Sequence, residues 1–180
     1  MKIKIFIFIL FLSALGSNVS AQRNVNNSEN YGRTLNLGLG VGGYAGYYGY
    51  IAHSIPVFNI NYEFDVANSF TLAPFLTFFT YHQNYYRETV IPLGVKGTYY
   101  FDQILGANPD WDFYLAGSLG FSIVKTTWDN GYTQNDTYNS ANPVFLDLHI
   151  GAEYHLSDKV GLFLDLSTGV STLGLAFHAF

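Results

Sequence analysis

Residues 144–155 read VFLDLHIGAEYH, and large apolar side chains alternate there with small or ionisable ones. Such a period of two is typical of a β-strand whose two faces meet different surroundings. One face would carry Val144, Leu146, Leu148, Ile150 and Tyr154, and the other Asp147, His149, Gly151, Glu153 and His155. The stretch therefore predicts a strand with one apolar and one polar face.

The same alternation recurs seven more times along the chain. Most of these stretches have about the 9–11 residues that a tilted strand needs to cross a bilayer. The pattern leaves the phase of residues 70–80 and 171–180 open. The seven stretches are residues 34–42, 58–66, 70–80, 91–101, 112–123, 161–167 and 172–178.

The connections between these stretches are of two kinds. Tight polar links at 67–69 and 157–159, and the segment 102–110, follow the second, sixth and fourth stretches. Longer segments rich in Tyr, Gly and Asn follow the first, third and fifth: Tyr44–Ser54, Tyr81–Glu88 and Lys125–Asn142. Short turns at one end and long loops at the other are the layout of an outer-membrane barrel.

Composition agrees with a membrane location. The chain is 49% hydrophobic and only 12% charged, about half the charged share of an ordinary soluble domain. With no cysteine, disulfides, cysteine-ligated metal centres and an N-terminal lipidated cysteine are excluded.

Residues 1–21 predict a secretory signal peptide. Lys2 and Lys4 precede the apolar run 5–12, and small residues lead to a cleavage site after Ala21. Residues 22–32 are then a polar, mobile periplasmic tail, and 33–180 the barrel domain. Cleavage leaves six Lys and Arg against 13 Asp and Glu, which argues against a nucleic-acid partner.

The size of the polar-face residues decides which face points outward. That face is mostly Gly, Ala, Ser, Thr and Asn, and the interior of an eight-stranded barrel is only just wide enough for side chains. The bulky apolar faces cannot fit there, so they must contact lipid. We therefore predict an all-β fold, an eight-stranded antiparallel up-and-down transmembrane β-barrel.

Aromatic residues near the strand ends predict interfacial girdles. At the short-turn end these are Tyr99, Tyr100, Phe101, Trp111 and Phe113. At the long-loop end they are Tyr44, Tyr47, Tyr48, Tyr81, Tyr85, Tyr86 and Trp128.

With its signal peptide, eight alternating stretches, the segment IPLGVKGTYYF at 91–101 and terminal Phe180, the chain resembles the small outer-membrane β-barrel domain proteins, of OmpA/OmpX-type architecture. The resemblance implies a place in the cell outer membrane, contact with its lipid, and insertion by the barrel-assembly machinery, which reads a terminal aromatic. Phe180 is out of phase with Phe177, which indicates a bulge or a weakened signal. Pro74 and Pro92 predict local bulges too.

Ionisable residues on the polar face could form a proton or ion site or a structural network. A network in which Lys96 pairs with one of the acids is favoured. His149 and Glu153 are about 13 Å apart along a strand, too far to share a metal ion. No catalytic, cofactor-binding or metal-binding residue, and no cofactor, is assigned. The ionisable residues on the polar face are Glu63, Asp65, Lys96, Asp112, Asp147, His149, Glu153, His155, Asp165 and His178.

Three functions remain open. The leading hypothesis is a structural or adhesion-like role, in which the long aromatic loops contact an extracellular protein or glycan. The second is a lipid-modifying enzyme that uses His53 with Ser54, or His82 with Glu88. The third is a secreted, soluble, lipocalin-like carrier. A solute pore is disfavoured because aqueous channels need 16–18 strands.

Overall fold

The computed structural model describes residues 31–42, 57–83, 85–131 and 144–178. They form eight strands and one short helix, α2, and no helix among them has the length and apolar composition to span a membrane. The elements are β1 (Thr34–Gly42), β2 (Val57–Ala67), β3 (Phe70–Gln83), β4 (Tyr86–Tyr100), α2 (Asp102–Leu105), β5 (Trp111–Trp128), β6 (Val144–Ser157), β7 (Val160–Ser167) and β8 (Val170–His178).

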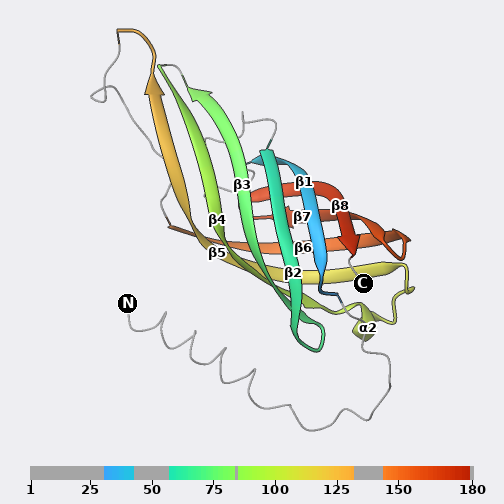
Figure 1. Ribbon diagram of the computed structural model, residues 1–180. Coiled ribbons are helices and arrows are strands. Elements are labelled where there is room, and N and C mark those ends of the chain that lie inside the picture. The colour runs from blue at the N-terminus through green and yellow to red at the C-terminus, as the bar shows by residue number, and fades with distance from the viewer. Residues whose placement is uncertain (1–30, 43–56, 84, 132–143, 179–180) are drawn as a thin grey trace, which may run out of the picture.

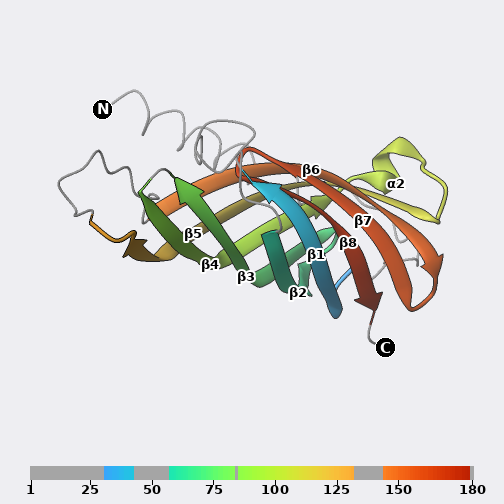
Figure 2. The same cartoon turned by 90° about the horizontal axis from the view of Figure 1, so that it is seen from above.

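The eight strands form a closed, up-and-down barrel. Each strand pairs antiparallel with its neighbours in the chain, and β1 pairs with β8 from Thr34↔His178 to Gly42↔Val170. Figure 2 shows β1 beside β8 at this closure. The pairing of β8 with β1 closes the sheet, as a sheet surrounded by lipid requires, and the ends of β3 (79–83) and β5 (122–128) extend past β2 and β6. The predicted fold is confirmed.

The apolar faces point outward, as predicted. Leu37 and Leu164 have 43% and 46% of their surface exposed. The open phases are also settled, because Leu76 of β3 and Leu173 of β8 point outward. A soluble carrier would bury these leucines inside the barrel, so its wall does not suit that hypothesis.

The prolines do not produce the expected bulges. Register is the same on both sides of Pro74, at Ile60↔Leu76 and Phe64↔Leu72, and β4–β5 pairing is continuous through Pro92↔Ser122. A proline removes one ladder donor without inserting a residue. The register shifts lie beside turns instead, between Asp65 and Ala67 and between His155 and Ser157.

Four strands are longer than a bilayer requires. β6 has 14 residues, and β3, β4 and β5 have 14, 15 and 18. Of these, β3, β4 and β5 run beyond the other strands at one end (Figure 1). We call this the ribbon end; the turn end holds α2 and the C terminus. The segment 81–88 was predicted as a loop, and that was wrong: Tyr81 pairs with Glu88 and Arg87 with Thr127. Tyr44–Ser54 and residues 132–142 lie outside the described residues.

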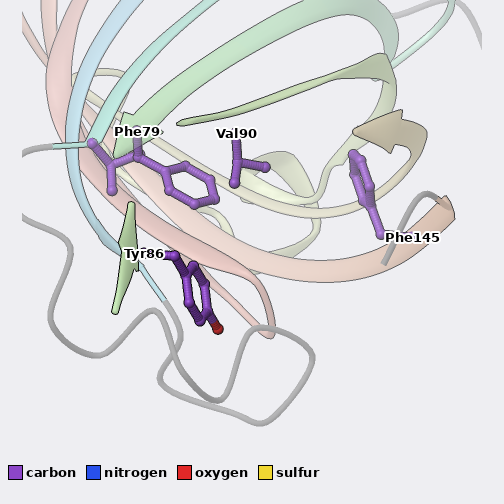
Figure 3. Packing of buried hydrophobic residues seen from close by; sticks show 5 residues of the cluster. Phe79, Tyr86, Val90 and Phe145 are labelled. Carbon is purple, nitrogen blue, oxygen red and sulfur yellow. The ribbon is translucent and has the colours of Figure 1, made fainter. Parts of the chain in front are cut away.

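At the ribbon end the polarity of the two faces is reversed. Facing inward, five buried residues form the ribbon cluster (Figure 3). Phe75, Val124, Trp128 and Val170, which are partly buried, pack against it. The outward face there is polar. On β5 the outward side chains change from apolar Ile123 to polar Lys125 and Thr127. The same change from apolar to polar occurs on β4 between Ile91 and Thr89, and on β3 between Phe78 and Thr80. The ribbon cluster is Val57, Phe79, Tyr86, Val90 and Phe145.

This reversal marks the edge of the apolar belt. Water replaces acyl chains beyond that edge, so the hydrophobic effect favours burying apolar side chains inside the barrel. The predicted girdle positions of Tyr86 and Trp128 are therefore wrong: both belong to the inward packing, with ring centroids 5.3 Å apart. Tyr85 is exposed, whereas Tyr44, Tyr47, Tyr48 and the side chain of Tyr81 lie outside the description.

The girdle at the turn end is largely as predicted. Trp111 and Tyr99 are exposed on the outer surface, and the Trp111 ring lies 5.9 Å from Phe113 and 4.9 Å from Tyr154. Tyr100 is the exception, because its position on β4 has inward parity. It stacks on Tyr31 inside the barrel, with centroids 4.0 Å apart. The last two residues of the predicted tail, 31 and 32, thus pack into the barrel end.

Candidate functional site

The centre of the lumen is an ion network around Lys96. Its Nζ atom lies 3.5 Å from Oε1 of Glu63 and 3.4 Å from Oδ2 of Asp165. All three side chains are buried, and buried charges are tolerated only when paired and hydrogen-bonded. The predicted pairing of Lys96 with an acid is confirmed, and it involves two acids.

Glu63 is held by three further donors from different strands. Asn36 Nδ2 donates to Oε1 at 3.0 Å, while Thr71 and Tyr100 donate to Oε2 at 2.7 and 2.8 Å. Asn36 also donates to Asn61. Both carboxylate oxygens are therefore satisfied without bulk water, which ties β1, β2, β3 and β4 together through their side chains.

Asp165 begins a second chain of hydrogen bonds. Its Oδ1 lies 2.7 Å from His149 Nδ1, and His149 Nε2 lies 2.9 Å from Ser118 Oγ. Tyr114 donates to Oδ2 at 3.2 Å. A serine, histidine and aspartate in this order have the connectivity of a hydrolase triad. The alternation in the sequence places His149 and Asp165 on the polar face but does not connect them to Ser118, because the three residues come from β5, β6 and β7 and Ser118 is one of many small polar residues.

The space beside Ser118 limits what this triad can do. A cavity of about 50 Å³ touches Ser118, His149 and Asp165, and Phe75 and Phe145 line it on the side of the ribbon cluster. That volume is well below the about 300 Å³ or more of small-molecule pockets. The space beside Ser118 is therefore of a size for ordered water, which could share a proton with the triad.

A second group of ionisable residues lies at the turn end. His155 Nε2 is 2.8 Å from Asp112 Oδ2, and His178 Nε2 is 2.8 Å from Glu153 Oε1. The two imidazole rings stack with centroids 5.0 Å apart. We call Asp112, Glu153, His155 and His178 the turn-end cluster. Sequence spacing missed this cluster because its members come from β5, β6 and β8.

The remaining predicted residues are not brought into one site. Asp147 is buried and accepts a hydrogen bond from Thr168, and Asp65 accepts one from the Gly32 amide. The pairing of His82 with Glu88 is wrong: Glu88 is fully buried and bonded to Thr126, whereas His82 is exposed, 3.2 Å from Asp129. His53 and Ser54 lie outside the described residues.

A closed antiparallel barrel with an apolar outer belt and a polar, extensively hydrogen-bonded interior is a transmembrane β-barrel. The belt includes Leu119, Leu146 and Leu148, each with about 60% of its surface exposed. Such a continuous apolar surface is stable only in contact with lipid.

No family model matches the sequence, and no curated protein matches it significantly. Similar solved structures include a de novo designed transmembrane β-barrel (13% identity, 83% of this chain, 98% of that chain, TM-score 0.46). Neisserial surface protein A is similar with 15% identity over 81% of this chain and 94% of that chain, at a TM-score of 0.48. The Yersinia pestis outer-membrane protein Ail is similar with 11% identity over 81% of this chain and 98% of that chain, at a TM-score of 0.45. The membrane assignment of this chain rests on its own outward residues.

Proposed function

We propose that the protein is an integral barrel of the bacterial outer membrane, delivered by its signal peptide and inserted by the barrel-assembly machinery. Its role is to present the ribbon and the connecting loops at the cell surface. The observation that carries this proposal is the polarity reversal of β3, β4 and β5, which indicates a water-facing extension on top of a lipid-facing barrel.

The direction of insertion follows from the two ends. The β2–β3 and β6–β7 turns and the α2 connection join strands at the turn end, whereas the two longest connections, residues 43–56 and 129–143, join strands at the ribbon end beside the tight β3–β4 and β7–β8 turns. Outer-membrane barrels place their longer loops on the extracellular side, so the ribbon would face outward. The ribbon's surface mixes Thr127, Arg87, Lys125 and the His82–Asp129 pair, which suits a neutral partner, an extracellular protein or a glycan.

Cysteine labelling on intact cells tests this orientation, because the natural chain has no cysteine. We expect Thr127→Cys to react with a membrane-impermeant maleimide on whole cells. Asp158→Cys, in the β6–β7 turn, should react only after the outer membrane is permeabilised. Leu119→Cys is the matched control on β5, since its outward side chain contacts lipid and should resist the hydrophilic reagent in both states. Labelling of Asp158→Cys on intact cells would reverse the proposed topology.

The Ser118–His149–Asp165 chain is part of the structural network in this proposal, and not an active site. We expect diisopropyl fluorophosphate to leave the mass of the folded protein unchanged, because its two isopropoxy groups exceed the space beside Ser118. Intact-protein mass spectrometry measures this directly. A covalent adduct that is present in the natural chain but absent from Ser118→Ala and His149→Gln would favour the enzyme hypothesis instead.

A further inference from the structure

The turn-end cluster is the one set of ionisable side chains in the described residues that combines two imidazoles with carboxylates at an open end of the barrel. The ligand atoms of Glu153, His155 and His178 all lie within 4.8 Å of one another. Glu153 is buried and the two histidines are half-buried. We propose that these three residues bind a divalent transition-metal ion of the zinc class.

The hydrogen bonds of His178 leave its contact with Glu153 without a donor hydrogen. The single hydroxyl hydrogen of Thr34 is donated to the carbonyl oxygen of Tyr31 at 3.0 Å. His178 Nδ1, 3.0 Å from Thr34 Oγ1, must then carry a hydrogen and donate it. In a neutral imidazole the other nitrogen, Nε2, is an acceptor. It faces the Glu153 carboxylate at 2.8 Å, so either a proton or a metal ion must lie between them.

A single divalent ion fits the hydrogen bonds of both histidines. A neutral His155 donates Nε2–H to Asp112 and presents the lone pair of Nδ1 to a metal ion. Protonating both histidines is the alternative that adds two charges. It would also stack two imidazolium rings 5.0 Å apart and nearly parallel, at 22°, and like charges at this range repel. One metal ion between His155, His178 and Glu153 provides the positive charge without that repulsion.

Gly161 provides the space in which Glu153 reaches His178. It lies on β7, between its partners His155 on β6 and Ala176 on β8. A Cβ atom at Gly161 would overlap Oε1 of Glu153. Positive φ angles among the described glycines occur at Gly106 and Gly131, so Gly161 is not needed for backbone geometry. Its missing side chain lets the carboxylate cross β7.

The donor set selects the metal class. Two histidines and a glutamate are the ligands of many zinc sites, with metal–ligand distances of about 2.0–2.2 Å. Calcium and magnesium prefer oxygen-only sites. Asp112 on His155 and Thr34 on His178 would act as the outer hydrogen-bond partners that orient metal-bound histidines. A tetrahedral ion needs the 2.8 Å contact between His178 and Glu153 to open by about half an ångström.

Calorimetric titration of zinc into the full barrel tests the proposal. The protein is produced without a polyhistidine tag, refolded in detergent micelles and treated with EDTA. We expect one equivalent of Zn²⁺ to bind, and Co²⁺ to give the visible absorption of a four-coordinate site. Gly161→Ala should weaken binding about 10–100-fold, and His178→Gln should abolish it. His82→Gln, which removes an exposed histidine at the ribbon end, should bind like the natural chain.

Refolding of each variant is checked by its faster gel migration before boiling. If His178→Gln does not fold, Glu153→Gln, which preserves the shape of the ligand, takes its place. Absence of zinc binding by the EDTA-treated natural chain overturns the proposal and assigns the cluster to proton sharing. Equal affinities of the natural chain, Gly161→Ala and the ligand variant would also overturn it, since the zinc would then bind elsewhere.

Discussion

Replacing Lys96 by Met should lower the free energy of unfolding by about 3–5 kcal/mol, because two buried carboxylates lose their shared counter-charge. Glu63 and Asp165 are both buried, at 3.5 and 3.4 Å from the lysine Nζ atom. Their remaining donors are hydroxyl, amide and imidazole groups, and Met fills the lysine's space without its charge. Urea-induced unfolding in lipid vesicles, followed by tryptophan fluorescence, measures the loss.

The control is Lys125→Met, on the outward face of β5 beyond the apolar belt. Removing that exposed charge should change stability by less than about 0.5 kcal/mol. A triple variant, Lys96→Met with Glu63→Gln and Asp165→Asn, should recover most of the loss because no buried charge remains. Equal stability of Lys96→Met and the natural barrel would show that water reaches the centre of the lumen.

The period-two pattern was enough to predict the wall of the barrel. Residue size decides its orientation: side chains such as Leu119 and Leu146 are too large for an eight-stranded lumen, and both point outward. The rule holds because each belt residue meets the same surroundings, lipid on one side and a narrow interior on the other. It therefore predicted the strands from local information alone.

The ribbon could not be predicted in the same way. Tyr86, Val90 and Phe79 have inward parity, so the apolar positions change face along β3 and β4 although the strands continue. If one apolar face is assumed for each strand, the strand is expected to end at this change, and residues 81–88 are predicted as a loop. The change of surroundings from lipid to water, and not the end of the strand, causes it.

The polar sites were missed for a different reason. Ser118, His149 and Asp165 are far apart in the sequence and meet only because β5, β6 and β7 are neighbours in register. The turn-end cluster also depends on the space at Gly161, and a glycine in a strand does not indicate from sequence that it makes room for a neighbouring carboxylate. Cross-strand register decides which inward side chains touch, and alternation within single strands cannot supply it.

Truncating Phe79 to Ala should cost about 3–5 kcal/mol of stability, as for other fully buried phenylalanines. Phe79 has no exposed surface and packs in the ribbon cluster with Val57, Tyr86 and Val90 (Figure 3). The ribbon has no lipid around it, so its rigidity depends on this cluster. The lost contacts leave a cavity that the surrounding strands cannot close without shifting.

The two tryptophans make the effect local and measurable. Trp128 packs against the ribbon cluster and Trp111 lies in the girdle at the turn end. In a Trp111→Phe background, Phe79→Ala should red-shift the emission of Trp128 and increase its quenching by acrylamide. In a Trp128→Phe background, the emission of Trp111 should not change. Thr127→Ala, outward on the same ribbon, should leave both signals and the stability nearly unaffected. If Phe79→Ala behaves like Thr127→Ala, the ribbon is not held by its inner packing, and a rigid surface platform is no longer supported.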